Sequence, residues 1–287
     1  MTGLLIINKE EGYTSRDVVN VVSKKFNTNK VGHTGTLDPI ATGVLVIAIG
    51  DALKLVEHLT QEDKEYIATV KLGLLTDTLD ITGVVLKQNN DYKIDKSKLI
   101  QILKSFLGKS IQEVPIYSAV KVNGKRLYEY ARKGIEVELP KREIEIFDIE
   151  LLEVMKDEFS FRVKVSKGTY IRSLIRDIGI KLGIDCCMKK LHRIKQGSFV
   201  IENSYTIDDI NNDNYKLIPV IKCLSEFEII KVDNFLKNKI SNGRILENRY
   251  TKEKIAFIDN DNNLLAIYKV YEKDITKVKP IKVLNKN

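Results

Sequence analysis

The order of the apolar patterns predicts an α+β fold for this chain. Residues 44–49 form an unbroken apolar run of strand length, whereas 99–107 repeat apolar residues at helical spacing. Such strand-like and helix-like segments follow one another without regular β-α-β alternation, which argues against a doubly wound parallel sheet. The length of 287 residues suggests about two domains, because a domain averages ~150 residues.

The N-terminal part is predicted to begin with a strand and an amphipathic helix. Residues 4–7 form a short apolar run, and Thr14 or Ser15 is the expected cap of the following helix. One face of that helix carries the apolar residues Val18, Val19, Val22 and Phe26. The buried strand at 44–49 comes next, and a further strand is predicted over 65–75.

The middle of the chain is predicted to hold a helix, a hairpin and a strand pair. The helical stripe at 99–107 ends at Gly108, a residue type that commonly terminates helices. Asn123-Gly124 is typical of a two-residue hairpin turn. The paired strands and the helix expected beyond this turn cover 143–154, 158–166 and about 170–182.

The C-terminal part is expected to form a separate, mostly β unit. Residues 208–214 are rich in Asp and Asn and could be a loop, while a domain boundary is expected near 225–232. The elements predicted beyond it are a helix at 233–240, a turn at Asn242-Gly243, and strands at 254–258 and 264–271. The predicted domains are therefore 1–230 and 231–287.

The composition is that of a globular protein, with 43% hydrophobic and 30% charged residues. No apolar run reaches the ~18 residues of a membrane span, and the N-terminus lacks the basic region of a signal peptide. The three cysteines show no CxxC pair and no Cys/His ligand spacing, so we expect inert thiols rather than disulfides or zinc. These features predict a cytoplasmic protein without a metal.

The net charge of +8 is concentrated in part of the chain. Residues 162–195 hold ten basic residues and two acids, and the rest of the chain is balanced. Residues 231–287 are also basic, with 13 Lys and Arg against seven acids. Two basic segments suggest an extended polyanionic partner, although a solvated charged face would have the same composition.

The strongest signal for function is the glycine-rich stretch 32–45, Gly-His-Thr-Gly-Thr-Leu-Asp-Pro-Ile-Ala-Thr-Gly-Val-Leu. Pro39 disfavours a helical conformation at Asp38, so the acid lies on a stiff turn that enters a buried strand. A carboxylate held in this way suits a nucleophile or a general base, although an isolated Leu-Asp-Pro is more often only a turn. The stretch is not a P-loop, because no Gly-Lys-Ser/Thr follows the glycines.

This stretch closely resembles the catalytic loop of the TruB family of tRNA pseudouridine synthases, and the resemblance extends from residue 4 to about 200. The other matching motifs are Asn8-Lys9 with Gly12-Tyr13-Thr14-Ser15, Lys64-Glu65-Tyr66 with Gly73, Asp77 to Gly83, Pro115 to Lys121, Ser166 to Leu174, and Leu191-His192-Arg193. Glu10 departs from the family, which usually has proline there. The resemblance implies a pseudouridine-synthase fold: a mixed, largely antiparallel central sheet flanked by helices, and a small β-rich PUA-like C-terminal domain.

The resemblance also implies an activity. Members of the family isomerise uridine-55 in the TΨC loop of tRNA to pseudouridine and need no cofactor or metal. Asp38 matches the catalytic aspartate, Arg172 matches its arginine partner, and Tyr66 matches the tyrosine that stacks on the uracil. Whether the carboxylate adds to the base or attacks the ribose C1′ is left open.

The resemblance implies further residues around the substrate. Its substrate-binding positions are His33, Tyr170, Leu191 and Lys9, with His33 next to the flipped nucleotide. For Lys9, a structural role and a solvated strand end remain alternatives. The spacing of Asp77 and Asp80 would suit a metal pair, but the motif around them favours a turn.

Contacts with the RNA are expected in several segments. Residues 114–142 fall where bacterial members of the family carry an inserted segment that grips RNA. The basic residues expected to contact the RNA backbone are Lys121, Lys125, Arg126, Arg132, Lys167 and Arg193. The 231–287 unit is expected to contact the acceptor stem of the tRNA.

Two other functions fit part of the sequence. A guide-RNA-dependent relative would share the aspartate loop, but the 114–142 segment and the lack of a long basic tail argue against it. A non-catalytic tRNA-binding module would not need the Asp38, Tyr66 and Arg172 set. We therefore expect a monomeric enzyme that acts on tRNA without a guide RNA and without a membrane.

Overall fold

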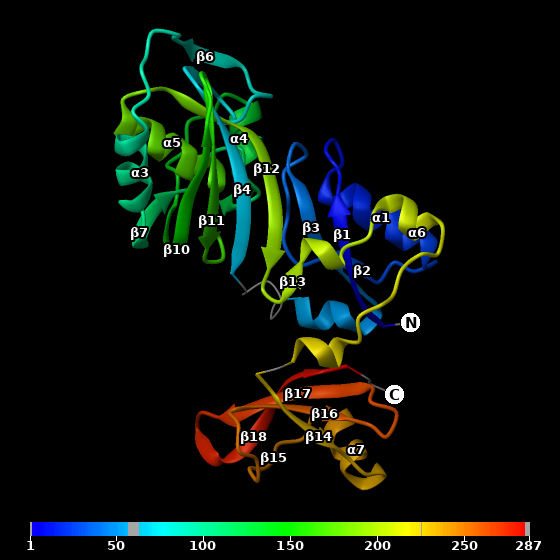
Figure 1. Cartoon of the computed structure of the whole chain (residues 1–287). Coiled ribbons are helices and arrows are strands. Elements are labelled where there is room, and N and C mark those ends of the chain that lie inside the picture. Colours follow the sequence, from blue (N-terminus) through cyan, green and yellow to red (C-terminus); the bar gives the residue numbers. More distant parts are fainter. Residues whose placement is uncertain (1, 57–62, 225, 285–287) are drawn as a thin grey trace.

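The computed structural model describes residues 2–56, 63–224 and 226–284, which form two large β-sheets with flanking helices and two two-stranded hairpins (Figure 1). The larger sheet has nine strands in the order β1-β3-β12-β4-β11-β10-β7, with β2 beside β3 and β13 beside β12. These strands are β1 (Gly3–Lys9), β2 (Val31–His33), β3 (Thr42–Ile49), β4 (Lys64–Leu72), β7 (Gly108–Glu113), β10 (Lys141–Val154), β11 (Glu158–Val165), β12 (Cys186–Gln196) and β13 (Phe199–Val200). Among the described strands of this sheet, the β3–β12 pair alone is parallel, so the sheet is mixed and largely antiparallel, as the resemblance implies.

Four helices pack beside this sheet at its two ends (Figure 1). α1 (Ser15–Lys25) and α6 (Ile207–Asn211) lie next to β1 and β2, while α3 (Lys96–Lys104) and α5 (Ile171–Leu182) lie next to β10 and β12. Their apolar faces share one core cluster with the adjoining face of the sheet. For α1 and α3 the helical period in the sequence correctly predicts the buried face, but α3 ends at Lys104 rather than at Gly108, and Leu107 is exposed.

β1 and β3 are buried on both faces, which explains their continuous apolar sequences. Leu5 and Ile7 point into the cluster under the helices. Leu4 and Ile6 point to the opposite side, into a second cluster that contains residues of the smaller sheet, such as Ile258. The two sheets are thus joined by apolar packing behind β1 and β3.

The helix that follows β1 begins as the sequence predicts. Thr14 is the cap, because its side chain accepts a hydrogen bond from the Asp17 amide while the Asp17 carboxylate accepts one from the Thr14 amide. Ser15, the alternative cap, instead turns inward and bonds to Leu37. The first turn of this helix is therefore tied to the aspartate loop.

β12 lies in the middle of the sheet, yet its apolar pattern does not predict a strand. Its pairing with β4 shifts register between Met188 and Lys190 and again between Arg193 and Lys195. Each bulge inserts one residue and interrupts the alternation of inward and outward side chains. Residues 186–196 consequently lack the regular alternation of apolar and polar side chains that would predict a strand.

Two other segments differ from the sequence prediction. The strand predicted over 65–75 ends at Leu72, because Gly73 takes a positive φ of 73° and turns the chain into β5 (Leu74–Thr76), which pairs with β6 (Val85–Gln88). Part of 208–214, described above as a possible loop, instead belongs to α6. Thr206 and Asp209 form a capping box there, which is the local signal for that helix.

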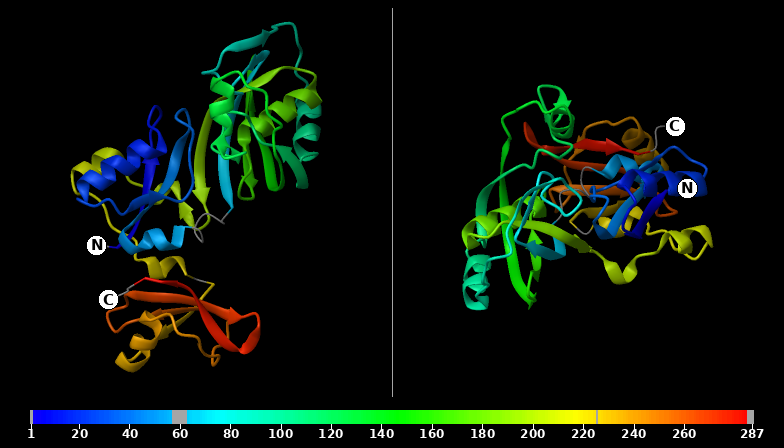
Figure 2. Two further views of the ribbon diagram at one scale, coloured as in Figure 1. Left: turned by 180° about the vertical axis from the view of Figure 1, so that it is seen from behind. Right: turned by 90° about the horizontal axis from the view of Figure 1, so that it is seen from above.

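The smaller sheet contains five strands in the order β14-β16-β17-β18-β15 and lies at the opposite end of the molecule from the β5–β6 hairpin (Figures 1 and 2). Its elements are β14 (Glu228–Lys231), α7 (Asn234–Ser241), β15 (Leu246–Glu247), β16 (Lys254–Ile258), β17 (Leu264–Tyr271) and β18 (Asp274–Val283). The predicted strands 254–258 and 264–271 are confirmed as β16 and β17. The described residues also contain three short 3-10 helices: η1 (Gly50–Leu55), η2 (Ile201–Asn203) and η3 (Val220–Cys223).

The 114–142 segment carries a hairpin and a short helix. β8 (Lys121–Val122) and β9 (Lys125–Arg126) pair across Asn123 and Gly124, both of which have positive φ, so the predicted hairpin turn is confirmed. α4 (Leu127–Arg132) follows directly.

The three cysteines are free thiols, and burial raises the pKa of Cys186 to about 12 and that of Cys187 to about 11. Both thiols therefore stay protonated and unreactive at neutral pH. Within the described part of the chain, His, Cys, Asp and Glu residues form no group of three suited to a metal ion. Helices of the described residues are all too short or too polar to span a membrane.

Candidate active site

Asp38 lies in the loop that connects β2 to β3. Both sides of this loop are fixed by backbone hydrogen bonds, from the Thr34 amide to the Val46 carbonyl (3.0 Å) and from the Ala41 amide to the Asp38 carbonyl (3.0 Å). The Asp38 side chain remains 34% exposed. The loop therefore presents a carboxylate to solvent from a constrained backbone.

Lys9 supports the aspartate loop from the protein interior. The residue is fully buried, and its Nζ donates to the carbonyl oxygens of Tyr13 (2.6 Å), Glu10 (2.9 Å) and Pro39 (3.1 Å). Burial lowers the pKa of Lys9 to about 8, which leaves the ammonium form dominant at pH 7. Because all three donors are used by the backbone, the structure favours the structural role for Lys9, in which it holds the loop, and its contact with substrate stays a prediction.

Arg193 supports the same loop from β12. Only 1% of the residue is exposed; its Nε donates to the Val44 carbonyl (2.7 Å) and its Nη2 to the Gly35 carbonyl (2.9 Å). The approach of the strands is so close that a Cβ on Gly43 would lie 2.3 Å from the Arg193 carbonyl oxygen. The guanidinium is buried under the loop, so the structure gives Arg193 a supporting role there, and its contact with the RNA backbone stays a prediction.

Ser15 and Gln196 also hold the loop, and the sequence reasoning missed both roles. The Ser15 Oγ accepts from the Leu37 amide (2.9 Å), and the Gln196 Nε2 donates to the Thr34 hydroxyl (2.5 Å). Ser15 belongs to one of the motifs of the resemblance, which is a usable signal. A single glutamine at the end of a strand carries no such signal.

Arg172 forms a bidentate ion pair with Asp38, as the resemblance implies. The Arg172 Nε lies 2.9 Å from Asp38 Oδ2, and its Nη2 donates to Oδ1 at 3.1 Å. Because the planar guanidinium matches both carboxylate oxygens, the pair fixes the orientation as well as the position of the acid. Arg172 is 6% exposed, so solvent screens this pair only weakly.

Two backbone carbonyls complete the surroundings of Arg172. Its Nη1 donates to the Thr78 carbonyl (3.0 Å), and its Nη2 also donates to the Tyr117 carbonyl (3.0 Å). The residue itself lies in the first turn of α5, where Gln112 on β7 bonds to both the amide (2.8 Å) and the carbonyl (3.1 Å) of Tyr170. The guanidinium is thus held by three parts of the chain, at Asp38, Thr78 and Tyr117.

A cavity of about 500 Å³ opens beside the Asp38–Arg172 pair. Its volume is in the range of sites that take a small ligand or a nucleotide. The lining residues are Thr34, Gly35, Thr36, Leu37, Asp38, Lys64, Tyr66, Tyr117, Ser118, Ala119, Tyr128, Gly168, Thr169, Tyr170, Ile171, Arg172, Leu191 and Arg193. The structure therefore brings the predicted residues Asp38, Tyr66, Arg172, Tyr170 and Leu191 together at one site.

Tyr66 and Leu191 form adjacent parts of the cavity wall. Tyr66 lies on β4 and Leu191 on the paired strand β12, and each residue is 7% exposed. Tyr170 adds a second aromatic ring from the start of α5. This wall offers apolar and aromatic surface to a planar ligand beside a charged pair.

His33, by contrast, is not among the residues that line the cavity. It ends β2 and directly precedes the loop, and its Nδ1 is buried without a hydrogen-bond partner among the described residues. Burial lowers its pKa, and the positive charges of Arg193 and Arg16 lower it further, so the ring is neutral at pH 7. Its predicted contact with a flipped nucleotide stays a prediction.

Asp77 and Asp80 are used in a turn, as the motif context predicts. The Asp80 carboxylate accepts from the Thr82 amide (2.9 Å) and the Thr78 hydroxyl (2.9 Å). The Asp77 carboxylate accepts from the Val84 amide (2.7 Å). These contacts tie both carboxylates into the turn.

The 114–142 segment places exposed cations next to the cavity. Tyr128 lines the cavity, and the guanidinium centres of Arg126 and Arg132 lie 5.8 and 5.3 Å from its ring centroid. The basic residues of the segment are all exposed, and none forms an ion pair with a described acid: Lys121, Lys125, Arg126, Arg132, Lys133, Lys141 and Arg142.

Most of the basic residues in 162–195 are already paired within the protein. The ion pairs with described acids join Arg162 to Glu65, Asp148 and Glu150, Lys164 to Asp63, Arg172 to Asp38, Arg176 to Glu113 and Asp177, and Lys189 to Glu158. Lys181 donates to the Ser105 hydroxyl, and Arg193 is buried. Lys167, Lys190 and Lys195 are exposed, and Lys167 lies next to the cavity residue Gly168. The concentration of charge in the sequence therefore overstates the charge that this segment offers to a partner.

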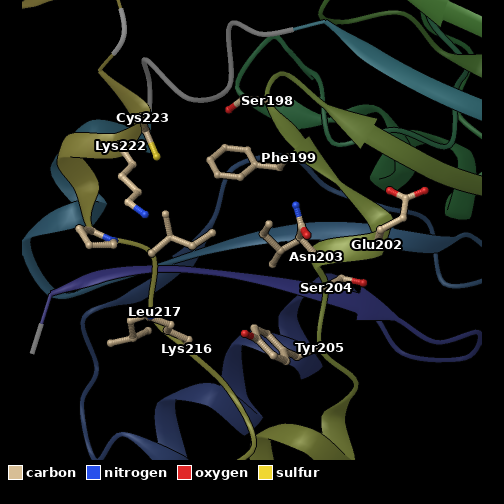
Figure 3. A pocket seen from close by; sticks show the side chains of 13 residues that line it. Ser198, Phe199, Glu202, Asn203, Ser204, Tyr205, Lys216, Leu217, Lys222 and Cys223 are labelled. Carbon is tan, nitrogen blue, oxygen red and sulfur yellow. The ribbon is translucent and has the colours of Figure 1, made fainter.

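A second cavity of about 520 Å³ lies behind β1, between residues 198–205 and 216–223 (Figure 3). Its charged residues Glu202, Lys216 and Lys222 are exposed on the rim. Unlike the Asp38 cavity, it contains no buried ion pair directed at the opening. The Asp38 cavity is therefore the candidate active site.

Comparison with known proteins agrees with this geometry. Residues 23–171 match the model of the TruB family pseudouridylate synthase (N terminal domain). A tRNA pseudouridine synthase B of Clostridium tetani is 45% identical over 270 residues, which are 93% of this chain and 92% of the relative. The tRNA pseudouridine synthase B of Oceanobacillus iheyensis is 43% identical over 99% of this chain and 97% of its own length.

Solved structures also match nearly the whole chain. A Cbf5-Nop10-Gar1 complex contains a chain with 27% identity and a TM-score of 0.72, over 99% of this chain and 85% of that one. An H/ACA RNP bound to a substrate RNA contains one with 25% identity and a TM-score of 0.71, over the same shares. The sequence identity, the shared fold and the aspartate–arginine cavity lead to one conclusion: the chain belongs to the TruB family of pseudouridylate synthases.

Proposed function

We propose that this chain isomerises uridine-55 in the TΨC loop of tRNA to pseudouridine, as a monomeric, cytoplasmic enzyme that needs neither a guide RNA nor a cofactor. The observation that carries the proposal is the Asp38 carboxylate, held by both of its oxygens against Arg172 at the edge of a cavity of about 500 Å³. Close relatives named tRNA pseudouridine synthase B support tRNA as the substrate.

In the proposed reaction, the bond between ribose C1′ and uracil N1 breaks, the base turns over, and C1′ bonds to C5. C5 loses its proton and N1 gains one, so the reaction is an isomerisation without a net loss of atoms. Asp38 supplies the nucleophilic oxygen, either to the base or to C1′, and Arg172 keeps that oxygen directed at the reacting atoms. Each oxygen still has a lone pair available, because the guanidinium uses only one on each.

The cavity wall accounts for how a base could be held outside the tRNA helix. Flipping a base costs a few kcal/mol, and stacking on an aromatic ring returns about 1–3 kcal/mol. Tyr66 offers such a ring close to the Asp38–Arg172 pair, while Leu191 closes the neighbouring wall. Tyr170 and Tyr128 add aromatic surface near the opening.

We propose that the tRNA backbone contacts the 114–142 segment and Lys167. Arg126 and Arg132 present guanidinium groups close to the Tyr128 ring, which lines the cavity, and neither forms an ion pair with a described acid. We further propose that residues 231–287 act as a PUA-like unit on the acceptor stem, supported by their excess of basic residues. The catalytic unit then comprises residues 1–230.

The guide-dependent alternative has support from the Cbf5 structures, one of which belongs to an H/ACA RNP. A stand-alone enzyme must bind its own RNA, and the exposed cations of the 114–142 segment meet that requirement. An assay with the purified chain as the single protein separates the two possibilities.

The test is tritium release from a tRNA transcript labelled at C5 of uridine. We expect the purified wild-type chain to release tritium, and Asp38→Asn to release none while it binds the transcript with unchanged affinity. Asp213→Asn is the matched control, because Asp213 is an exposed acid that pairs with Lys25 far from the cavity. A transcript with cytidine at position 55 should release no tritium with any variant.

Three outcomes would contradict the proposal. Turnover by Asp38→Asn near the wild-type rate would remove Asp38 from the nucleophilic role. Turnover only after addition of a guide RNA would favour the guide-dependent function. Unchanged tritium release from the position-55 cytidine transcript would place the target elsewhere in the tRNA.

A further inference from the structure

Tyr117 makes two contacts that bear on the Asp38–Arg172 pair. Its hydroxyl donates to Asp77 Oδ2 at 2.9 Å, and its backbone carbonyl accepts from Arg172 Nη2 at 3.0 Å. Asp77 is followed by Thr78, whose carbonyl accepts from Arg172 Nη1 at 3.0 Å. The two carbonyls that accept from Arg172 therefore lie in different segments, one in 77–83 and one in 115–118. The Tyr117–Asp77 hydrogen bond joins these two segments.

The 77–83 segment is itself a rigid partner for this bond. The second Asp77 oxygen accepts from the Val84 amide at 2.7 Å, and the Asp77 amide donates to the Val84 carbonyl at 3.1 Å. The turn is tight, since a Cβ on Gly83 would lie 2.4 Å from Asp77 Oδ1. The carboxylate that receives the Tyr117 hydroxyl is consequently fixed in place.

The 115–118 segment lacks comparable support of its own. It follows the end of β7 at the start of the 114–142 segment, and among its described residues Tyr117 provides the side-chain link to the 77–83 turn. Its other anchors are backbone bonds: the Val114 amide to the Pro140 carbonyl (3.0 Å) and the Tyr128 amide to the Ser118 carbonyl (3.2 Å). Loss of the Tyr117 hydroxyl would therefore release one of the two carbonyls that orient Arg172.

We propose that Tyr117 is a positioning residue, which acts through its hydrogen bond to Asp77 to hold the Arg172 guanidinium in the geometry that orients Asp38. This inference rests on the proposed function and adds a residue to its machinery. The hydrogen bond to Asp77 raises the pKa of Tyr117, so the phenol keeps its proton and remains a donor. The positive charge of Arg132 acts in the opposite direction on this pKa, and its guanidinium cannot accept the hydroxyl proton.

The test compares Tyr117→Phe, which keeps the ring and removes only the hydroxyl, with Asp77→Ala, which removes the acceptor, and with the double variant. Tyr117→Phe should lower kcat about tenfold, the scale of one lost hydrogen bond to a charged group, with KM for tRNA changed less than about twofold. The double variant should lose no more than the worse single variant, because both remove the same bond. In an Arg172→Lys background, Tyr117→Phe should cost less than about twofold.

Tyr130→Phe is the matched control. It also deletes a phenol hydroxyl from the 114–142 segment, but its bond goes to the Val122 carbonyl at 3.0 Å, within that segment. A normal kcat for this variant would show that general loosening of the segment is not enough. Amide hydrogen exchange of residues 77–84, measured without RNA, should become faster in Tyr117→Phe and stay unchanged in Tyr130→Phe. This measurement reports on the hydrogen bond independently of activity.

The outcomes separate the inference from the proposed function. An inactive wild-type chain would contradict the proposed function, and the exchange measurement would still decide whether the bond orders the turn. An active wild type with an unimpaired Tyr117→Phe would overturn the inference alone. An effect confined to KM, or an undiminished effect in the Arg172→Lys background, would make Tyr117 a direct substrate contact and would equally overturn it.

Discussion

The 114–142 segment and the 162–195 segment are both rich in lysine and arginine, yet the structure uses their charge differently. In 162–195, five of the ten cations form ion pairs with described acids, and Arg172 and Arg193 hold the aspartate loop. In 114–142, the cations are exposed beside the cavity. A high local charge therefore identifies an RNA-binding surface only where the protein leaves that charge without a partner.

Replacement of Arg172 by lysine should have the largest effect. A single ammonium cannot bond to both Asp38 oxygens and both backbone carbonyls, so kcat should fall by about 10²-fold or more, with the tRNA Kd changed less than about twofold. Single-turnover kinetics and a filter-binding titration measure the two quantities. Lys181→Arg, in the same helix, should be silent. A tRNA affinity that falls along with kcat would mean that Arg172 serves the RNA surface after all.

Replacement of Arg193 by methionine should have the second-largest effect, which should be a loss of stability. The Val44 and Gly35 carbonyls would lose their buried donors, which should lower the free energy of unfolding by about 2–4 kcal/mol. Denaturant titration monitored by circular dichroism measures the change. Lys195→Met on the same strand is the control and should change it by less than about 0.5 kcal/mol. Wild-type stability with weakened RNA binding would restore Arg193 to the RNA contacts.

The double variant Arg126→Ala/Arg132→Ala should affect binding rather than folding. We expect the tRNA Kd to rise about tenfold near 100 mM salt and the slope of log K against log salt to fall by about 1.5–2, because two phosphate contacts would be lost. The midpoint of thermal unfolding should not change. A slope equal to that of the wild type would show that these arginines do not meet phosphate.

Substitutions of paired cations in 162–195 should have the smallest effects. Arg162→Gln and Lys189→Gln each break surface ion pairs, so each should change the free energy of unfolding by less than about 1 kcal/mol. The salt slope of tRNA binding should remain that of the wild type. A reduced salt slope for either variant would show that paired cations of 162–195 also contact the RNA, so that the two segments would not differ in this respect.

Local chemistry made much of the fold predictable. The Thr14 cap, the Asn123-Gly124 turn and the strands β16 and β17 follow from short-range patterns that their own residues satisfy. β12 could not be predicted in this way, because two bulges remove the alternation that reports a strand. The bulges depend on how β12 pairs with β4, which no window of the sequence contains.

For the candidate site, too, one part could be predicted from the sequence and another part could not. Motif order along the chain was sufficient to assemble Asp38, Tyr66 and Arg172, together with Tyr170 and Leu191, because each lies in a distinctive stretch of sequence. Burial, however, decided what each cation does. Lys9 and Arg193 are basic residues of the matching motifs, but both donate to backbone carbonyls inside the protein. A charge is a property of one residue, whereas its partner is supplied by segments that meet only when the chain has folded.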